Sequence, residues 1–183
     1  YGAVVVCSDS PALVEIIPDI RRSILTYGLS ADSQVSAQNI SHTGSESTFQ
    51  VIKDENFLGE ISIDVPGKHN VTNSLASVTL GLELGIPFSA ISRGIQSYSG
   101  VKRRFEIKGT CHDVMVVDDY AHHPTEVRAT LDAAKDGWNR RIIAVFQPHL
   151  FTRTRDFYQD FADSFSIADI LIVTEIFPSR EDP

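Results

Sequence analysis

Residues 114–134 constrain the fold most, because an apolar segment there runs through a polar loop directly into a helical pattern. Val-Met-Val-Val at 114–117 predicts a buried strand, and residues 125–134 have the composition of a helix. The loop between them reads Asp-Asp-Tyr-Ala-His-His-Pro, and Pro124 suits the first turn of a helix because it has no N–H to leave unpaired. A strand that leads into a helix is typical of an α/β sheet, in which ligands bind at the carboxyl edge.

The rest of the second half alternates in the same way. Further helices and strands are predicted at 125–134, 142–146, 153–165 and 170–173. This order predicts one parallel sheet of three strands with right-handed crossovers. In the helix at 153–165, Phe157, Phe161 and Phe165 are four residues apart, which predicts one buried stripe. The carboxyl-edge loops are expected at 118–123, 147–152 and 174–182.

The first half shows a different pattern. Short strands are predicted at 4–7 and 24–28, with a helix that opens at Pro11. Three segments between 33 and 65 alternate with period two, which predicts a small antiparallel meander. A helix then carries an apolar stripe, and a shorter helix starts at Phe88. The stripe consists of Val71, Leu75, Val78 and Leu82, and a domain boundary is predicted at 99–101.

Composition narrows the class of protein. The chain has 183 residues, enough for one ordinary domain or parts of two. The net charge of −8 argues against a sequence-independent nucleic-acid binder, and no apolar run is long enough to predict a membrane span. Cys7 and Cys111 have no metal-type spacing, which favours reduced thiols in a cytosolic protein. The N-terminus does not read as a signal peptide and suggests a strand cut from a longer chain.

Three polar positions at two predicted strand ends are candidates for one cleft. His122 lies after the strand at 114–117, and His149 and Arg153 follow the strand at 142–146. Imidazole carries protons near neutral pH, and guanidinium holds carboxylates through two parallel hydrogen bonds. The alternative is an ordinary polar loop beside solvated arginines. Two cations at a helix start nevertheless call for an anion or a neighbouring acid, because the helix dipole disfavours them there.

A second set of candidates lies earlier in the chain. Asn70 and Asn73 are three residues apart at the start of a helix, so they face the same side and can present donors and acceptors to a heterocycle. The alternative reading of Asn70 is a helix cap. Arg104, next to Phe105 in a basic cluster, is a candidate phosphate clamp, and the alternative is a solvated linker.

Four stretches taken together resemble the Mur ligase family, and the resemblance covers essentially the whole chain. It implies an α/β fold: residues 1–101 as the later part of a central ATP-binding domain with a small antiparallel meander, and 102–183 as the first part of a Rossmann-like parallel-sheet domain. The stretches are Pro-Gly-Lys-His-Asn-Val-Thr-Asn at 66–73, Gly-Val-Lys-Arg-Arg-Phe-Glu at 100–106, Asp-Asp-Tyr-Ala-His-His-Pro-Thr-Glu at 118–126 and Phe-Gln-Pro-His at 146–149.

The resemblance implies ATP-dependent amide formation through an acyl phosphate, in the synthesis of peptidoglycan precursors. It is strongest to the branch that joins L-alanine to UDP-N-acetylmuramate. The murein-peptide ligase branch, which joins a tripeptide to the same sugar, stays open. A metal-dependent hydrolase is a reading of another class. It would use the two acids and two imidazoles of the 118–123 loop, which are Asp118, Asp119, His122 and His123.

The resemblance also assigns roles. Asn70 and Asn73 would contact adenine, Arg104 phosphate and Asp119 ribose. His122, His149 and Arg153 would be the catalytic residues, and with Tyr120 they would bind the alanine substrate. Leu150 departs from a basic residue in some relatives, and His69 and His123 are left as structural. The cofactors would be ATP and Mg²⁺, with the metal ligands expected upstream of this chain. Since the family's P-loop is absent from these residues, the chain is expected to be an inactive piece that can self-associate.

Overall fold

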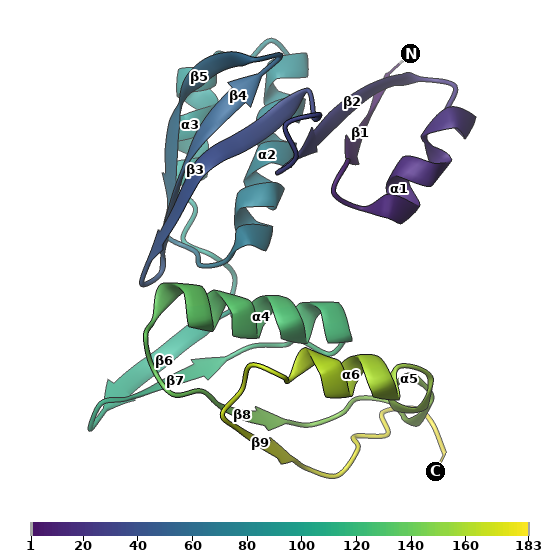
Figure 1. The fold of residues 1–183 in the computed structure, drawn as a ribbon, viewed down its shortest axis with the longest axis vertical. Coiled ribbons are helices and arrows are strands. Elements are labelled where there is room, and N and C mark those ends of the chain that lie inside the picture. The colour runs from purple at the N-terminus through teal and green to yellow at the C-terminus, as the bar shows by residue number, and fades with distance from the viewer. Residues whose placement is uncertain (1, 183) are drawn as a thin grey trace. The chain divides into compact units, whose positions relative to one another are not determined.

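The computed structural model describes residues 2–182. The chain separates into two compact units, which meet in sequence between Ser99 and Gly100. Each unit is a layer of strands covered by helices (Figure 1). None of the helices within residues 2–182 has the length and apolarity needed to cross a bilayer.

Unit 1 is built on one five-stranded mixed sheet in the order β1-β2-β3-β4-β5. The first three strands are parallel, and β3, β4 and β5 form an antiparallel meander. The predicted meander is confirmed, and the structure adds that it continues the parallel pair at the N-terminus. The elements are β1 (Ala3–Cys7), α1 (Pro11–Ile16), the 3-10 helix η1 (Ile17–Asp19), β2 (Ser23–Gly28), β3 (Val35–Thr43), β4 (Glu46–Lys53), β5 (Asn56–Ile63), α2 (Lys68–Glu83) and α3 (Phe88–Gln96).

The core of unit 1 lies between the meander and the helices α2 and α3 (Figure 1). Val71, Leu75 and Val78 of α2 are completely buried, as the apolar stripe predicted. Phe49 from β4 and Ile61 from β5 are equally buried on the facing side. Burial of these side chains, at about 1.5–3 kcal/mol each, is what holds the helix on the sheet.

The junction between β2 and β3 is short. The two strands pair only through residues 27–28 and 35–36. The connection is reinforced by reciprocal side-chain bonds: the Thr26 N–H donates to Oε1 of Gln34 at 2.9 Å, and the Gln34 N–H donates to Oγ1 of Thr26 at 3.0 Å. The meander therefore joins the parallel pair through a narrow seam.

Unit 2 contains two small sheets. The strands β8 and β9 are parallel, whereas β7 pairs antiparallel with β6. The predicted single sheet of three parallel strands is therefore wrong, because no pairing joins β7 to β8 within the described residues. The elements are β6 (Glu106–Cys111), β7 (Val114–Asp118), α4 (Pro124–Gly137), β8 (Ile143–Phe146), α5 (Phe151–Asp156), α6 (Tyr158–Ser164) and β9 (Ile170–Val173).

The strand β6 was not predicted from the sequence. Its residues are mostly polar, and Gly109 lies at an irregular point in its pairing with β7. The turn between the two strands consists of His112 and Asp113, with φ of 46° and 61°. Two consecutive residues with positive φ match the twist of a tight hairpin, so β6 is held next to β7 by the turn.

The predicted helix at 153–165 is wrong in its bounds. Two helices, α5 and α6, are separated at Phe157, whose φ of −116° and ψ of 21° leave the helical region. Phe161 and Phe165 are buried against Phe146, as the stripe predicted. Phe157 is 38% exposed instead, and its ring lies edge-on to His123 with centroids 4.9 Å apart. Phe157 therefore packs against the 118–123 loop through His123 instead of joining the buried stripe.

Unit 2 leaves one face of its strands uncovered. The helices α4 and α6 lie on one side of β8 and β9 (Figure 1). On β8 the side chains alternate: Phe146 is buried in the helix-covered core, while Ile143 and Val145 are 54% and 68% exposed. Their register partners on β9, Ile170 and Ile172, are exposed as well. These four apolar side chains are therefore exposed together on one face, and Leu171 and Val173 of β9 are exposed as well.

Candidate functional site

The loop after β7 brings aromatic and imidazole rings together with the loop after β8. The ring centroids of Tyr120 and His122 are 5.0 Å apart, and those of His122 and His149 are 6.2 Å apart. His122 and His149 are both half-buried. Three of the four predicted alanine-side residues are therefore neighbours.

Arg153 completes this group from α5. Its Nη1 lies 3.3 Å from Nδ1 of His149, four residues earlier. A guanidinium can only donate, so Nδ1 of His149 is the acceptor and the hydrogen of the neutral ring lies on Nε2. His149 thus offers a donor, and Arg153 adds a positive charge beside it.

The imidazole of His122 carries its hydrogen on the other ring nitrogen from that of His149. Its Nδ1 lies 2.8 Å from the carbonyl oxygen of Tyr120, which can only accept. Nδ1 therefore carries the hydrogen, and Nε2 of the neutral ring is a free acceptor. The two imidazoles together present one acceptor, Nε2 of His122, and one donor, the Nε2–H of His149. A ligand that carries an amine next to a carboxylate would match both.

Glu126, on the first turn of α4, organises the His122 side of this group. Its Oε2 accepts from the backbone N–H groups of His122 at 3.0 Å and of His123 at 3.2 Å. Its Oε1 lies 3.4 Å from Nη1 of Arg104. Partial burial raises the pKa of Glu126, but the His122 N–H and the nearby imidazole and guanidinium outweigh it and hold the pKa below its usual value.

His123, which is predicted from the sequence to be structural, caps α4. Its Nδ1 accepts from the backbone N–H of Thr125 at 3.3 Å, while its own N–H donates to Glu126. This reciprocal bonding is a capping box with histidine in the position usually held by serine or threonine. The cap fixes the end of the loop that carries His122.

Asp119 is engaged within the loop. One carboxylate oxygen accepts from the Phe105 N–H at 2.8 Å, and the other accepts from the Ala121 N–H at 2.7 Å. These bonds tie the start of β6 to the loop after β7. Contact between Asp119 and a ribose stays a prediction, and it would use the remaining lone pairs.

Two further residues belong to the site but were not selected from the sequence. The guanidinium carbon of Arg103 lies 4.6 Å from the ring centroid of Tyr120, a cation–π contact. Phe177 stacks on His149 with centroids 5.7 Å apart, and its N–H donates to the Pro148 carbonyl at 2.8 Å. The loop after β9 was expected at this edge, but no pattern distinguished Phe177 within it.

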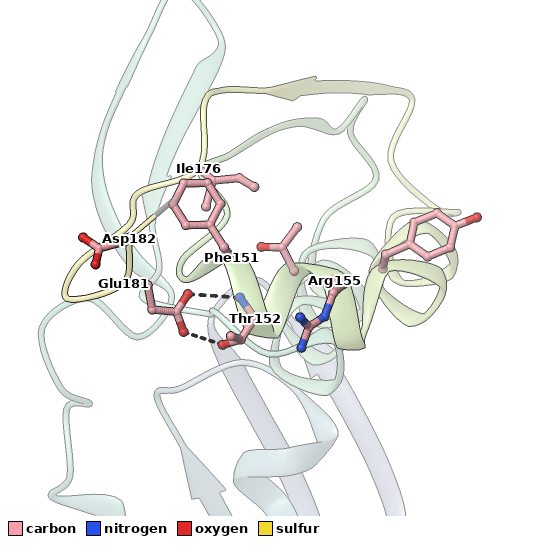
Figure 2. Close-up of a pocket in the computed structure, with 8 residues that line it drawn as sticks. Phe151, Thr152, Arg155, Ile176, Glu181 and Asp182 are labelled. Carbon is pink, nitrogen blue, oxygen red and sulfur yellow. Dashed lines mark hydrogen bonds between the residues drawn. The ribbon is translucent and has the colours of Figure 1, made fainter.

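A pocket of about 520 Å³ opens beside α5 (Figure 2). Its lining does not include His122 or His149. Glu181 closes one end, because its carboxylate accepts from both the backbone N–H and the hydroxyl of Thr152. Arg153 and Arg155 lie in the last turn of α5, where the helix dipole favours cations, so the expectation that they occupy a helix start and require an anion or a neighbouring acid is wrong. Phe151 and Ile176 give the pocket an apolar wall (Figure 2).

The predicted adenine contacts lie in unit 1. Asn70 and Asn73 belong to the first turns of α2, and Asn73 is exposed. The cap position is held by Gly67, so the reading of Asn70 as the helix cap is wrong. The amide nitrogen of Asn70 donates to the Pro66 carbonyl at 2.7 Å and lies 3.1 Å from Nε2 of His69. This geometry leaves the side-chain oxygen of Asn70 to accept from a ligand.

The geometry argues against the metal-dependent hydrolase. Asp118 lies 3.7 Å from Nε of Arg103, Asp119 binds two backbone amides, and His123 caps a helix. The four side chains of the loop therefore do not converge on one point. Across residues 2–182, no three His, Cys, Asp or Glu side chains are grouped as a metal site would need.

A chain with imidazole and guanidinium groups at the ends of α/β strands is suited to binding anionic small molecules. Comparison with known proteins identifies the class. Residues 1–81 match the model of the Mur ligase middle domain, and residues 103–183 match that of the Mur ligase glutamate ligase domain. The chain belongs to the Mur ligase family.

Its curated relatives carry one particular name. The chain is 46% identical over 183 residues to a protein of Geotalea uraniireducens and 45% identical over 184 residues to one of Salinibacter ruber. Both are called UDP-N-acetylmuramate–L-alanine ligase. The matches cover 100% of this chain but only 40% and 39% of those relatives.

Solved structures agree. The crystal structure of the UDP-N-acetylmuramate–alanine ligase MurC from Thermotoga maritima has 32% identity and a TM-score of 0.72, covering 84% of this chain and 34% of that one. A MurF ligase from the same organism, solved in complex with ADP, has a TM-score of 0.74 at 16% identity, covering 93% and 39%. The second comparison concerns the fold alone.

Proposed function

We propose that this chain is part of an ATP-dependent ligase that joins L-alanine to the carboxylate of UDP-N-acetylmuramate in peptidoglycan precursor synthesis. The observation that carries the proposal is the match of all 183 residues, at 42–46% identity, to relatives named for this reaction. Residues 1–101 would be the later part of the central ATP-binding domain, and 102–183 the first part of the C-terminal domain.

The proposed reaction has two steps. The muramyl carboxylate oxygen takes the γ-phosphoryl group of ATP, and ADP leaves. The alanine amine then attacks the carbonyl carbon of the acyl phosphate, phosphate leaves, and the nitrogen loses a proton. As the family resemblance implies, Mg²⁺ would be bound by residues upstream of this chain, and this chain would contribute positioning and charge stabilisation.

The polarity of the imidazole pair supports a particular orientation of alanine. Arg153 and the Nε2–H of His149 would hold the carboxylate, because both donate and one is charged. The free Nε2 of His122 would accept a hydrogen from the amine. Tyr120 would border the small methyl side chain.

The nucleotide would be bound by the second set of residues. Asn70 and Asn73 would contact adenine, Arg104 the phosphates and Asp119 the ribose. What supports this assignment is chemical type: an exposed carboxamide at the start of α2 and a half-exposed guanidinium in unit 2.

The test is an assay of the longer protein that contains this chain. ADP release and product mass are measured with ATP, UDP-N-acetylmuramate and either L-alanine, glycine, L-serine or a cell-wall tripeptide. Alanine-dependent ADP release with an alanyl product is expected. Preference for the tripeptide would assign the protein to the murein-peptide branch, and ADP release that ignores every acceptor would refute the proposal.

A further inference from the structure

Glu126 contacts both Arg104, which is predicted to bind phosphate, and His122, which is predicted to bind the amine. Its Oε2 lies 3.0 Å from the backbone nitrogen of His122 and 3.4 Å from Nδ1 of the same residue. Its Oε1 lies 3.4 Å from Nη1 of Arg104. The two oxygens of one group therefore connect side chains that are 18 positions apart in the sequence.

The position of Glu126 makes this connection specific. About a third of its side chain is exposed, and the same holds for His122. The helix cap holds its carboxylate in place, because the His123 N–H donates to Oε2 at 3.2 Å. A carboxylate held in this way has little freedom to turn from one partner without changing its contact with the other.

We infer that Glu126 is a positioning residue that couples Arg104 to His122, so that the state of the phosphate-side guanidinium is transmitted to the amine-side imidazole. This inference rests on the proposed function for the identity of the two ligands. When an anion draws Arg104 away, Glu126 loses its guanidinium partner and keeps the imidazole of His122. The hydrogen on Nδ1 is then shared between Glu126 and the Tyr120 carbonyl, and Nε2 remains the acceptor.

The consequence is that anion binding at Arg104 would favour amine binding at His122. Phosphate binding at Arg104 would strengthen the contact that fixes the tautomer of His122, and thereby prepare the imidazole for the amine. By reciprocity, an amine at His122 would favour anion binding at Arg104. The coupling needs no movement of the backbone, because the cap bonds of Glu126 remain in place throughout.

The first test needs no catalysis. Side-chain signals of His122 are followed by ¹⁵N-histidine NMR on the 183-residue chain in a double-mutant cycle. Arg104→Ala should shift the His122 signals in the wild-type background and leave them unmoved in a Glu126→Gln background. Glutamine keeps an oxygen for the cap bonds, so the variant is expected to fold. Lys102→Ala, in the same basic segment, is the control and should not move His122.

The second test uses the longer ligase. Glu126→Gln should raise the KM for alanine at saturating ATP by at least about fivefold, because the carboxylate contact to His122 is lost. Arg104→Ala should leave that KM nearly unchanged, because it releases Glu126 as bound phosphate would, and the double variant should show the Glu126→Gln effect alone. Equal His122 shifts in both backgrounds, or none in either, would overturn the inference. If the NMR coupling is present but alanine is not a substrate, the proposed function fails and the link through Glu126 stands.

Discussion

The imidazoles of His122 and His149 lie 6.2 Å apart and have opposite hydrogen-bonding polarity. A carbonyl oxygen places the hydrogen of His122 on Nδ1, whereas a guanidinium excludes it from Nδ1 of His149. Two residues of one type thereby acquire different chemical roles from their neighbours. This difference leads directly to the first prediction.

In the proposed ligase that contains this chain, His122→Ala should reduce kcat/KM for alanine far more than it raises the KM for ATP. Loss of one polar contact to the reacting amine should cost about 1–3 kcal/mol in transition-state stabilisation. Steady-state kinetics with each substrate varied in turn measure the effect. His112→Ala, in the hairpin turn between β6 and β7, is the control, and equal losses in the two variants would remove His122 from the site.

Asn73→Ala should act on the nucleotide alone. The exposed carboxamide at the start of α2 is predicted to contact adenine, so the KM for ATP should rise by about fivefold, corresponding to roughly 1 kcal/mol. The KM for alanine should stay as it is. ATP titration of the proposed ligase decides the matter, with Thr72→Ala as the matched change on the same turn. An effect seen only with alanine would place the adenine elsewhere.

Glu126 should make the stability of unit 2 depend on pH. Its pKa in the folded chain lies below the ordinary value of 4.5. The carboxylate therefore stabilises the fold above its unfolded pKa, and this contribution is lost as the pH falls through the folded pKa. Trp138, which stacks on Phe105, is the single tryptophan and reports on unit 2 by fluorescence.

Urea unfolding of the wild type and Glu126→Gln, followed at Trp138, provides the measurement. The wild type should be the more stable at pH 7, and the gap should narrow as the pH falls below about 4.5. Glu83→Gln, at the exposed end of α2, is the control. A gap that stays constant between pH 7 and pH 3 would show that the charge of Glu126 contributes nothing.

The uncovered face of β8 and β9 should cause self-association of the 183-residue chain. Ile143 and Val145 are 54% and 68% exposed, and an apolar face exposed on an open sheet favours contact with a second copy. Val145→Lys should lower the apparent mass in sedimentation velocity. Leu84→Lys, which changes an equally exposed apolar side chain in unit 1, should leave the mass unchanged. A wild-type chain that is monomeric at high concentration would contradict the prediction.

The parts of the fold that depend on local pattern were predictable. Val71, Leu75 and Val78 have the spacing of a helix with one apolar face, and such a face is expected to be buried, as it is here. The strand β6 could not be found in this way, because its polar residues are held in place by a turn of two left-handed residues. The break at Phe157 was equally hidden, since the spacing of the phenylalanines continues through it.

The site was predictable to the extent that residue type alone indicates chemistry. His122, His149 and Arg153 could be selected because each follows a predicted strand. Glu126 could not be selected for its role, since a glutamate at the start of a helix is ordinary and its importance lies in contacts with residues before it in the chain. Phe177 depends on the same kind of long-range contact, in its case with His149.

Because β2 and β3 pair over so few residues, the two parts of the unit 1 sheet should differ in local stability. The three strands of the meander are joined by ladders between sequence neighbours, which form quickly because little chain has to be ordered to close them. The parallel pair at the N-terminus is hydrogen-bonded to the meander through only four residues of backbone, and it is otherwise held by contacts of β1 and β2 with α2. Protection of its amides against solvent exchange should therefore be lost first, in openings that leave the meander closed. The N-terminal segment would then be the last part of unit 1 to assemble and the first to detach.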